Sequence, residues 1–185
     1  LLKKRPVTYC LTQRLLNSRS AIESIYHALK TYPVEGKRGF VVGSESPWIE
    51  VYALLHGADE VYSFILPFPR TNQNRFDFAM SFSSIEHSGL GRYGDATDPI
   101  GDLREVWKVL CLLKPGGTFY LGLPRGADSV VYNVHRIYGA IRLAMLMTGT
   151  QLQSVGCYSH ALRVLPTLSS TIWRHETQQT LFLDN

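Results

Sequence analysis

Residues 103–124, LREVWKVLCLLKPGGTFYLGLP, contain a helix signal, a breaker and a strand signal in direct succession. Apolar residues recur at helical spacing in the first half, which predicts a helix over residues 103–113. Residues 114–117, Lys-Pro-Gly-Gly, end that helix, because the lysine suits a helix C-terminus and the proline and glycines reverse the backbone. Residues 118–123 then form an unalternating apolar run, as in a strand that is buried on both faces.

The segment upstream predicts a βαβ unit. Residues 39–43, GFVVG, read as a short buried strand. Pro47 is well placed to begin a helix, and Gly57 to end it. Residues 60–65 follow as a second strand, and residues 76–82 as another. Strands that alternate with helices in this way predict an α/β fold with a parallel sheet.

The two ends of the chain carry weaker signals. We expect residues 1–17 to be an N-terminal extension and residues 18–185 to form one domain. The pattern predicts that residues 130–147 are largely helical. Residues 152–158 and 180–183 are expected to form an antiparallel pair of strands at the sheet edge.

Composition places the chain among ordinary globular proteins. The net charge is only +4, and basic residues are scattered without a stripe of interleaved aromatics, so there is no strong signal for nucleic-acid binding. The three cysteines have no metal-type spacing. No apolar run reaches the length of a membrane span, and we expect a reducing, cytoplasmic compartment. The chain begins at Leu1 rather than Met, as a fragment of a longer protein would.

The opening run resembles the helix, turn and fifth strand of class I S-adenosylmethionine (SAM)-dependent methyltransferases, where a helix ending in L-K-P-G-G precedes an apolar strand. Residues 76–87, FDFAMSFSSIEH, resemble the fourth strand of that family and the turn after it. The resemblance implies a Rossmann-like class I methyltransferase sheet, mostly parallel, with helices on both faces. It also implies SAM as the cofactor.

Residues 81–138 more narrowly resemble a family of uncharacterised, methyltransferase-like animal proteins, described as a domain of unknown function. The matching stretches are SSIEHSGLGRYGD at 83–95, DPIGD at 98–102 and YNVHRIYG at 132–139. This resemblance implies a fold and a cofactor. It leaves the methyl acceptor open, as a small molecule or a protein.

The loop after the first strand of the βαβ unit is the expected cofactor loop. Ligands of open parallel sheets lie beyond the carboxyl ends of the strands, where the strand order reverses. Here that place is held by Gly43, Ser44 and Glu45. The resemblance implies a glycine-rich loop whose backbone approaches the amino-acid end of SAM, and this chain keeps Gly43 but loses the later glycines. Ser44 and Ser46 can donate hydrogen bonds there, and Glu45 can hold the ammonium of the cofactor. The alternative is a plain turn with a solvated Glu45.

The segment after the second strand departs from the family pattern. The resemblance leads us to expect an acidic ribose ligand near Ile65, but residues 61–66 contain no acid. The interval from Ile65 to Phe76 is also too short for the usual helix, third strand and helix. We therefore expect a sheet that lacks its third strand, which weakens the case for adenosine binding.

The turn after the fourth strand holds further candidate residues. The resemblance places Ser83, Ser84 and Glu86 around the cofactor, and His87 could act as a general base near neutral pH. The alternative is that Glu86 and His87 cap or orient the following loop.

The last candidates lie in and after the glycine-rich loop. His135 is a second candidate catalytic residue, and the neighbouring Arg136 would suit an anionic acceptor, unless both belong to the polar face of a helix. Asp95, Asp98 and Asp102 could in principle hold a divalent ion. We instead expect no metal, a solvated loop, and Asp102 as a helix cap.

Two functions remain open on the sequence. The first is a SAM-dependent methyltransferase, and the second is a non-catalytic Rossmann-like module with an incomplete cofactor site. A nucleotide-dependent oxidoreductase is disfavoured, because no G-x-G-x-x-G fingerprint follows the first strand.

Overall fold

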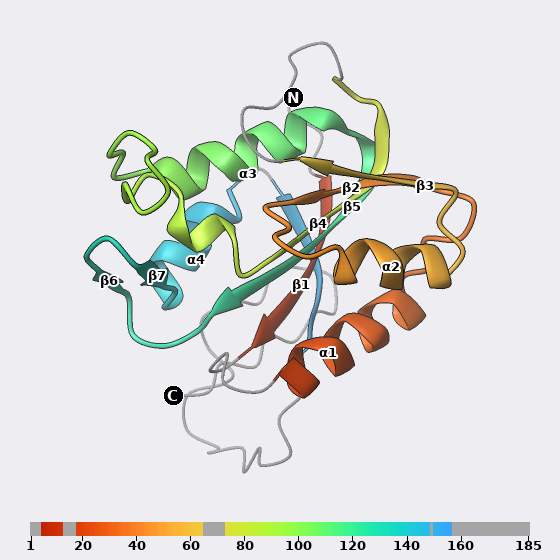
Figure 1. The fold of residues 1–185 in the computed structure, drawn as a ribbon, viewed down its shortest axis with the longest axis horizontal. Helices are drawn as coiled ribbons and strands as arrows, with labels where there is room; N and C mark the ends of the chain where they lie inside the picture. The colour runs from red at the N-terminus through yellow and green to blue at the C-terminus, as the bar shows by residue number, and fades with distance from the viewer. Residues whose placement is uncertain (1–4, 13–17, 65–72, 149, 157–185) are drawn as a thin grey trace.

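The computed structural model describes residues 5–12, 18–64, 73–148 and 150–156. Within these ranges the chain forms a six-stranded sheet in the order β3-β2-β4-β5-β1-β8, and every pairing is parallel (Figure 1). The strands are β1 (Arg5–Thr12), β2 (Arg38–Val42), β3 (Glu60–Phe64), β4 (Phe76–Phe82), β5 (Leu113–Pro124) and β8 (Thr150–Gly156). The predicted α/β fold with a parallel sheet is confirmed.

Helices cover both faces of the sheet, as predicted (Figure 1). They are α1 (Ser18–Thr31), α2 (Trp48–Leu55), α3 (Gly101–Leu112) and α4 (Ala140–Leu146). Consecutive strand residues divide between two cores: Phe40 packs with α3 and α4, and Val41 packs with α1 and α2. Phe119 and Tyr120 divide in the same way. Alternate side chains are thus buried on opposite faces, which explains the continuous apolar runs of these strands.

The stretch that decides the fold is arranged as expected, with one refinement at the breaker. Helix α3 ends at Leu112, and β5 begins at once, pairing Leu113 with Phe76. The register then shifts, and the ladder resumes where Thr118 pairs with Phe78. The Lys-Pro-Gly-Gly breaker is therefore an irregular section inside β5.

The two ends of the chain differ from expectation. Residues 5–12, predicted to be an extension outside the domain, form β1, which lies between β5 and β8 within the sheet. Strand β8 includes residues 152–156 of the predicted strand, but it pairs with β1 in parallel and not with an antiparallel partner. Residues 157–158 of that prediction lie outside the described residues. Its predicted partner, residues 180–183, lies outside the described residues.

The prediction that residues 130–147 are largely helical is wrong in its first half. That half is an antiparallel hairpin of β6 (Ser129–Val131) and β7 (His135–Ile137), and only α4 is helical. Val130, Val131 and Tyr132 favour extended backbone. Asn133 adopts a positive φ of 54° in the connecting turn, which asparagine tolerates better than most residues.

The topology sets the place of a site. From β2 the chain passes through α2 to β3, and from β4 it passes through α3 to β5 on the opposite side. The strand order therefore reverses between β2 and β4. Strand β3 is the sheet edge within the described residues. Most of the interval in which the third strand is predicted to be missing, residues 65–72, lies outside them. None of the helices in the described ranges is long and apolar enough to cross a membrane.

Candidate functional site

A cleft of about 1030 Å³ opens at the carboxyl ends of β2 and β4, where the strand order reverses. Its size is that of a small-molecule site, about 300–1,000 Å³. The walls come from the loop after β2, the turn after β4, the glycine-rich loop and one side of α3. Polar lining residues include Ser44, Glu45, Ser46, Ser83, Ser84, His87, Ser88, Asp95, Asp98, Arg104, Glu105 and Lys108. The structure thus brings five of the six predicted cofactor-binding residues to one cleft, since Gly43 lines it as well.

Gly43 is required by its surroundings. Its φ of 70° lies in the left-handed region, and a Cβ added here would collide with the Ser84 side chain. Its N–H donates a 3.1 Å hydrogen bond to the carbonyl of Phe64 at the end of β3. The loop after β2 is therefore held against both neighbouring strands, β3 and β4.

Glu50, in the first turn of α2, makes hydrogen bonds that connect the same loop to β3. It is only 6% exposed, and Ser63 Oγ donates a 2.6 Å hydrogen bond to its Oε1. Ser44 Oγ lies 3.1 Å from Glu50 Oε2 and 2.8 Å from the carbonyl of Ser46. Sequence reasoning missed Glu50, although an acidic residue in the first turn after a strand–helix loop was an available signal.

The two predicted catalytic histidines are neighbours. The rings of His87 and His135 lie 6.3 Å apart, but only His87 lines the cleft. His87 Nδ1 lies 2.5 Å from the carbonyl of Val134 on the hairpin turn, so Nδ1–H donates and Nε2 is the acceptor of the neutral ring. Burial lowers the pKa of His87, and the charges of Arg92 and His135 lower it further.

Glu86 lies behind the cleft wall. Its side chain is fully buried, it does not line the cleft, and neither carboxylate oxygen has a hydrogen-bond partner in the described part of the chain. Burial raises the pKa of Glu86 to about 7. The backbone N–H of Glu86 itself, the Ser83 hydroxyl and the Ser84 backbone N–H oppose this shift without reaching hydrogen-bonding geometry. The predicted role of Glu86 as a cofactor ligand does not fit this position.

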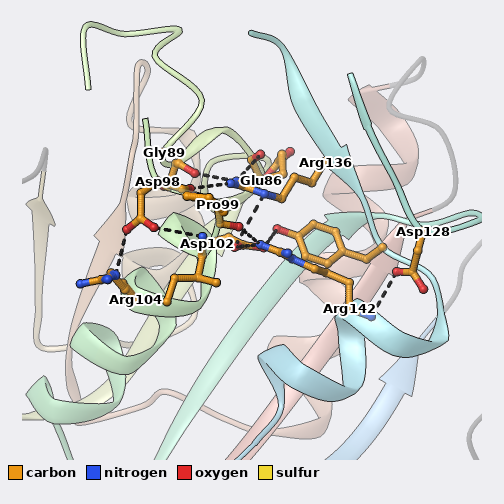
Figure 2. A network of polar contacts seen from close by, with 12 residues as sticks. Glu86, Gly89, Asp98, Pro99, Asp102, Arg104, Asp128, Arg136 and Arg142 are labelled. Atoms are coloured by element: carbon orange, nitrogen blue, oxygen red, sulfur yellow. Dashed lines mark hydrogen bonds and ion pairs between the residues drawn. The ribbon is translucent and has the colours of Figure 1, made fainter. Parts of the chain in front are cut away.

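Arg136 fastens the β6–β7 hairpin to the loop that follows β4 (Figure 2). The side chain is only 2% exposed. Its Nη1 donates to the carbonyl of Ser88 at 2.5 Å, and its Nη2 donates to the carbonyl of Asp98 at 3.1 Å. The guanidinium is committed to these contacts and does not line the cleft, so it is not positioned to bind an anionic acceptor.

The three aspartates of the glycine-rich loop are used in protein contacts. Asp95 accepts from the backbone N–H of Gly89 at 2.6 Å, and Asp98 pairs with Arg104 at 2.8 Å. The predicted helix cap at Asp102 is wrong, because Ile100 is the N-cap residue and Asp102 lies inside α3. Asp102 is fully buried and pairs with Arg142 of α4 (Figure 2).

The α3 wall of the cleft contains a second buried acid that the sequence did not single out. Glu105 is 6% exposed, and its Oε1 lies 2.6 Å from Lys108 Nζ. Burial raises the pKa of Glu105, and the charge of Lys108 opposes this. The cleft therefore has a serine-rich side at the strand ends and a charged side along α3.

The fold and the cleft define a Rossmann-like α/β protein with a ligand-sized site at its topological switch point. The family described as "Caenorhabditis protein of unknown function, DUF268" matches residues 68–183 of this chain. The chain belongs to that family. No curated protein and no solved structure matches the chain.

Proposed function

We propose that this protein is a SAM-dependent methyltransferase whose cofactor lies in the cleft between β2 and β4. The observation that carries the proposal is the convergence of the Gly43 loop and the Ser83-Ser84 turn on one cleft at the switch point. The resemblance of residues 76–87 and 103–124 to class I methyltransferases supports the same assignment.

The residues that line the cleft fit the amino-acid end of SAM. Glu45 is exposed on the cleft wall, and its charge favours protonation of His87. A carboxylate in this position suits the ammonium of the cofactor. Ser83 and Ser84 supply hydroxyls from the turn after β4. Bound SAM would supply a methyl group activated by a sulfonium, and the protein would contribute mainly by holding the acceptor in line with it.

Calorimetric titration with SAM and S-adenosylhomocysteine tests this function directly, with ATP and NAD⁺ as comparison ligands. We expect SAM and its product to bind, and Glu45→Gln to weaken binding about tenfold through loss of a charged hydrogen bond. The matched control is Glu23→Gln on the exposed side of α1, which should leave binding unchanged. A titration with millimolar SAM that shows no binding would reject the proposal.

The second candidate is a non-catalytic module, and a specific observation favours it. The family pattern places an acidic ribose ligand near the end of β3, but the last described residues of that strand are Ser63 and Phe64. The Ser63 hydroxyl is already used in its hydrogen bond to Glu50. In this alternative the chain binds neither SAM nor S-adenosylhomocysteine, while keeping a cooperative unfolding transition. Tight binding of either compound by the unmodified chain would eliminate it.

A further inference from the structure

The carboxylate of Glu86, behind the cleft wall, lies next to the imidazole of His87, which lines the cleft. His87 Nε2 is 3.9 Å from Glu86 Oε1. Glu86 is completely buried, whereas the His87 side chain is 15% exposed and lines the cleft. A buried carboxylate without a hydrogen bond in the described ranges is costly, and such groups cluster at functional sites.

The orientation of the His87 ring gives its two nitrogens different neighbours. The Val134 carbonyl holds the Nδ1 proton, so a further proton can bind only at Nε2, the nitrogen that faces Glu86. The contact with Val134 also fixes the ring against the β6–β7 hairpin. Protonation of Nε2 would therefore place the new positive charge next to the Glu86 carboxylate.

The other charged groups around the pair are committed elsewhere or act weakly. Arg136 approaches the backbone carbonyl of Glu86, at 3.4 Å. Tyr138 interacts with the Glu86 charge, but its hydroxyl donates to Asp102. His87 also experiences Arg92, His135 and Glu45, as described above. Among the described residues, His87 is thus the base best placed to share a proton with Glu86.

We propose that Glu86 and His87 act as one proton-accepting pair, and that the methyl acceptor is therefore a molecule whose reacting atom carries a proton, a hydroxyl or an amine. This inference rests on the proposed methyltransferase function. His87 is the residue at the cleft, and Glu86 acts through it as a positioning residue.

The chemistry requires such a pair for this class of acceptor. When a hydroxyl or amine is methylated, a lone pair on its oxygen or nitrogen forms the bond to the methyl carbon. The carbon–sulfur bond breaks with its electron pair left on sulfur, and one proton leaves the acceptor atom. His87 Nε2 takes up that proton, and the Glu86 carboxylate neutralises the imidazolium. A carboxylate or thioether acceptor releases no proton and would gain nothing from the pair.

The pair has a pH signature that does not depend on any cofactor. Burial raises the pKa of Glu86 to about 7 and lowers that of His87, so the first proton taken up as pH falls goes to the Glu86 carboxylate, 3.9 Å from His87 Nε2. Above that pH both groups are in their basic forms, and the pair can accept a proton. We therefore expect the His87 ring resonance of the unliganded chain to shift near pH 7.

Titration of histidine ring resonances by NMR tests the pair, with His87→Gln to assign the signal. In Glu86→Gln we expect the step near pH 7 to disappear from the His87 signal, since the neighbouring carboxylate that titrates there is gone. The matched control is Glu105→Gln, which removes another buried acid and should leave the His87 titration as in the unmodified chain. Identical His87 titrations in Glu86→Gln and the unmodified chain would overturn the proposal.

A measurement on the unmodified chain covers the case in which Glu86→Gln does not fold. Carboxyl-labelled glutamate should show one resonance, that of Glu86, that titrates near pH 7 together with His87. An independent midpoint near 4.5 would overturn the pair. Because these titrations need no cofactor, they are separate from the calorimetry: failure of SAM binding would reject the methyl transfer and leave the titration result standing.

Discussion

Asp102 and Arg142 form a two-pronged ion pair that joins α3 to α4. Arg142 Nη2 lies 2.5 Å from Asp102 Oδ1, and Arg142 Nε lies 3.0 Å from Oδ2. Asp102 is fully buried, and Tyr138 donates to the same carboxylate at 2.9 Å. Arg142 also donates to the carbonyl of Pro99 at 2.6 Å, so the same side chain ties α4 to the loop that precedes α3 (Figure 2).

Removing one partner of this pair should strongly destabilise the folded chain. Arg142→Ala leaves the Asp102 charge buried, and we expect a loss of about 3 kcal/mol in the free energy of unfolding, measured in urea. The matched control is Arg38→Ala, which breaks the exposed Arg38–Glu60 pair and should change stability little. If the two variants were equally stable, the buried pair would not hold α4 in place.

Gly43→Ala should destabilise the fold at the cleft. The substitution places a side chain at a φ of 70° and drives a Cβ into Ser84, so we expect a loss of about 2 kcal/mol or more. Gly36→Ala is the control, because its φ is 65° but its Cβ would meet open space. The excess cost at Gly43 should shrink in the double variant Gly43→Ala with Ser84→Gly. An undiminished cost in that double variant would show that the collision is not its cause.

The sequence predicted best where local pattern and tertiary structure agree. Strand β4 was predicted with its observed bounds, and the helix–breaker–strand order of residues 103–124 was correct, because apolar spacing and the Pro-Gly-Gly breaker act within a few residues. The position of β1 in the sheet was missed, since its partners in β5 are more than a hundred residues away in sequence. The burial of Glu86 could not be predicted either, because it depends on the packing of the β6–β7 hairpin against the turn after β4.

Ser63→Ala tests whether Glu50 orders the loop after β2 in addition to stabilising the fold. The substitution removes the 2.6 Å hydrogen bond to Glu50, and we expect a loss of about 1 kcal/mol in the free energy of unfolding. Because Glu50 also contacts Ser44, the loop after β2 should become more mobile, and SAM should bind more weakly than this small loss suggests. Ser129→Ala is the control, since its hydroxyl bonds to Ala127 away from the cleft. Unchanged SAM affinity in Ser63→Ala would show that Glu50 has no role in ordering the loop.

Glu86 should make the protein less stable as pH rises. Its pKa is about 7 in the folded chain, against an ordinary value of 4.5. Between these two values the folded state holds a proton that the unfolded state has lost, so the free energy of unfolding falls as pH increases through this window. Below pH 4.5 Glu86 is protonated in both states, so its contribution to the free energy of unfolding no longer depends on pH. Above pH 7 it is ionised in both states, and the free energy of unfolding is lower by about 3 kcal/mol than below pH 4.5.

Glu86→Gln has no such proton, so its stability relative to the unmodified chain should rise by about that amount between pH 4 and pH 8 in urea denaturation. Glu23→Gln, at an exposed position, should run parallel to the unmodified chain across the same range. If Glu86→Gln also ran parallel, Glu86 would be ionised at its ordinary pKa, and burial would not be what sets its charge.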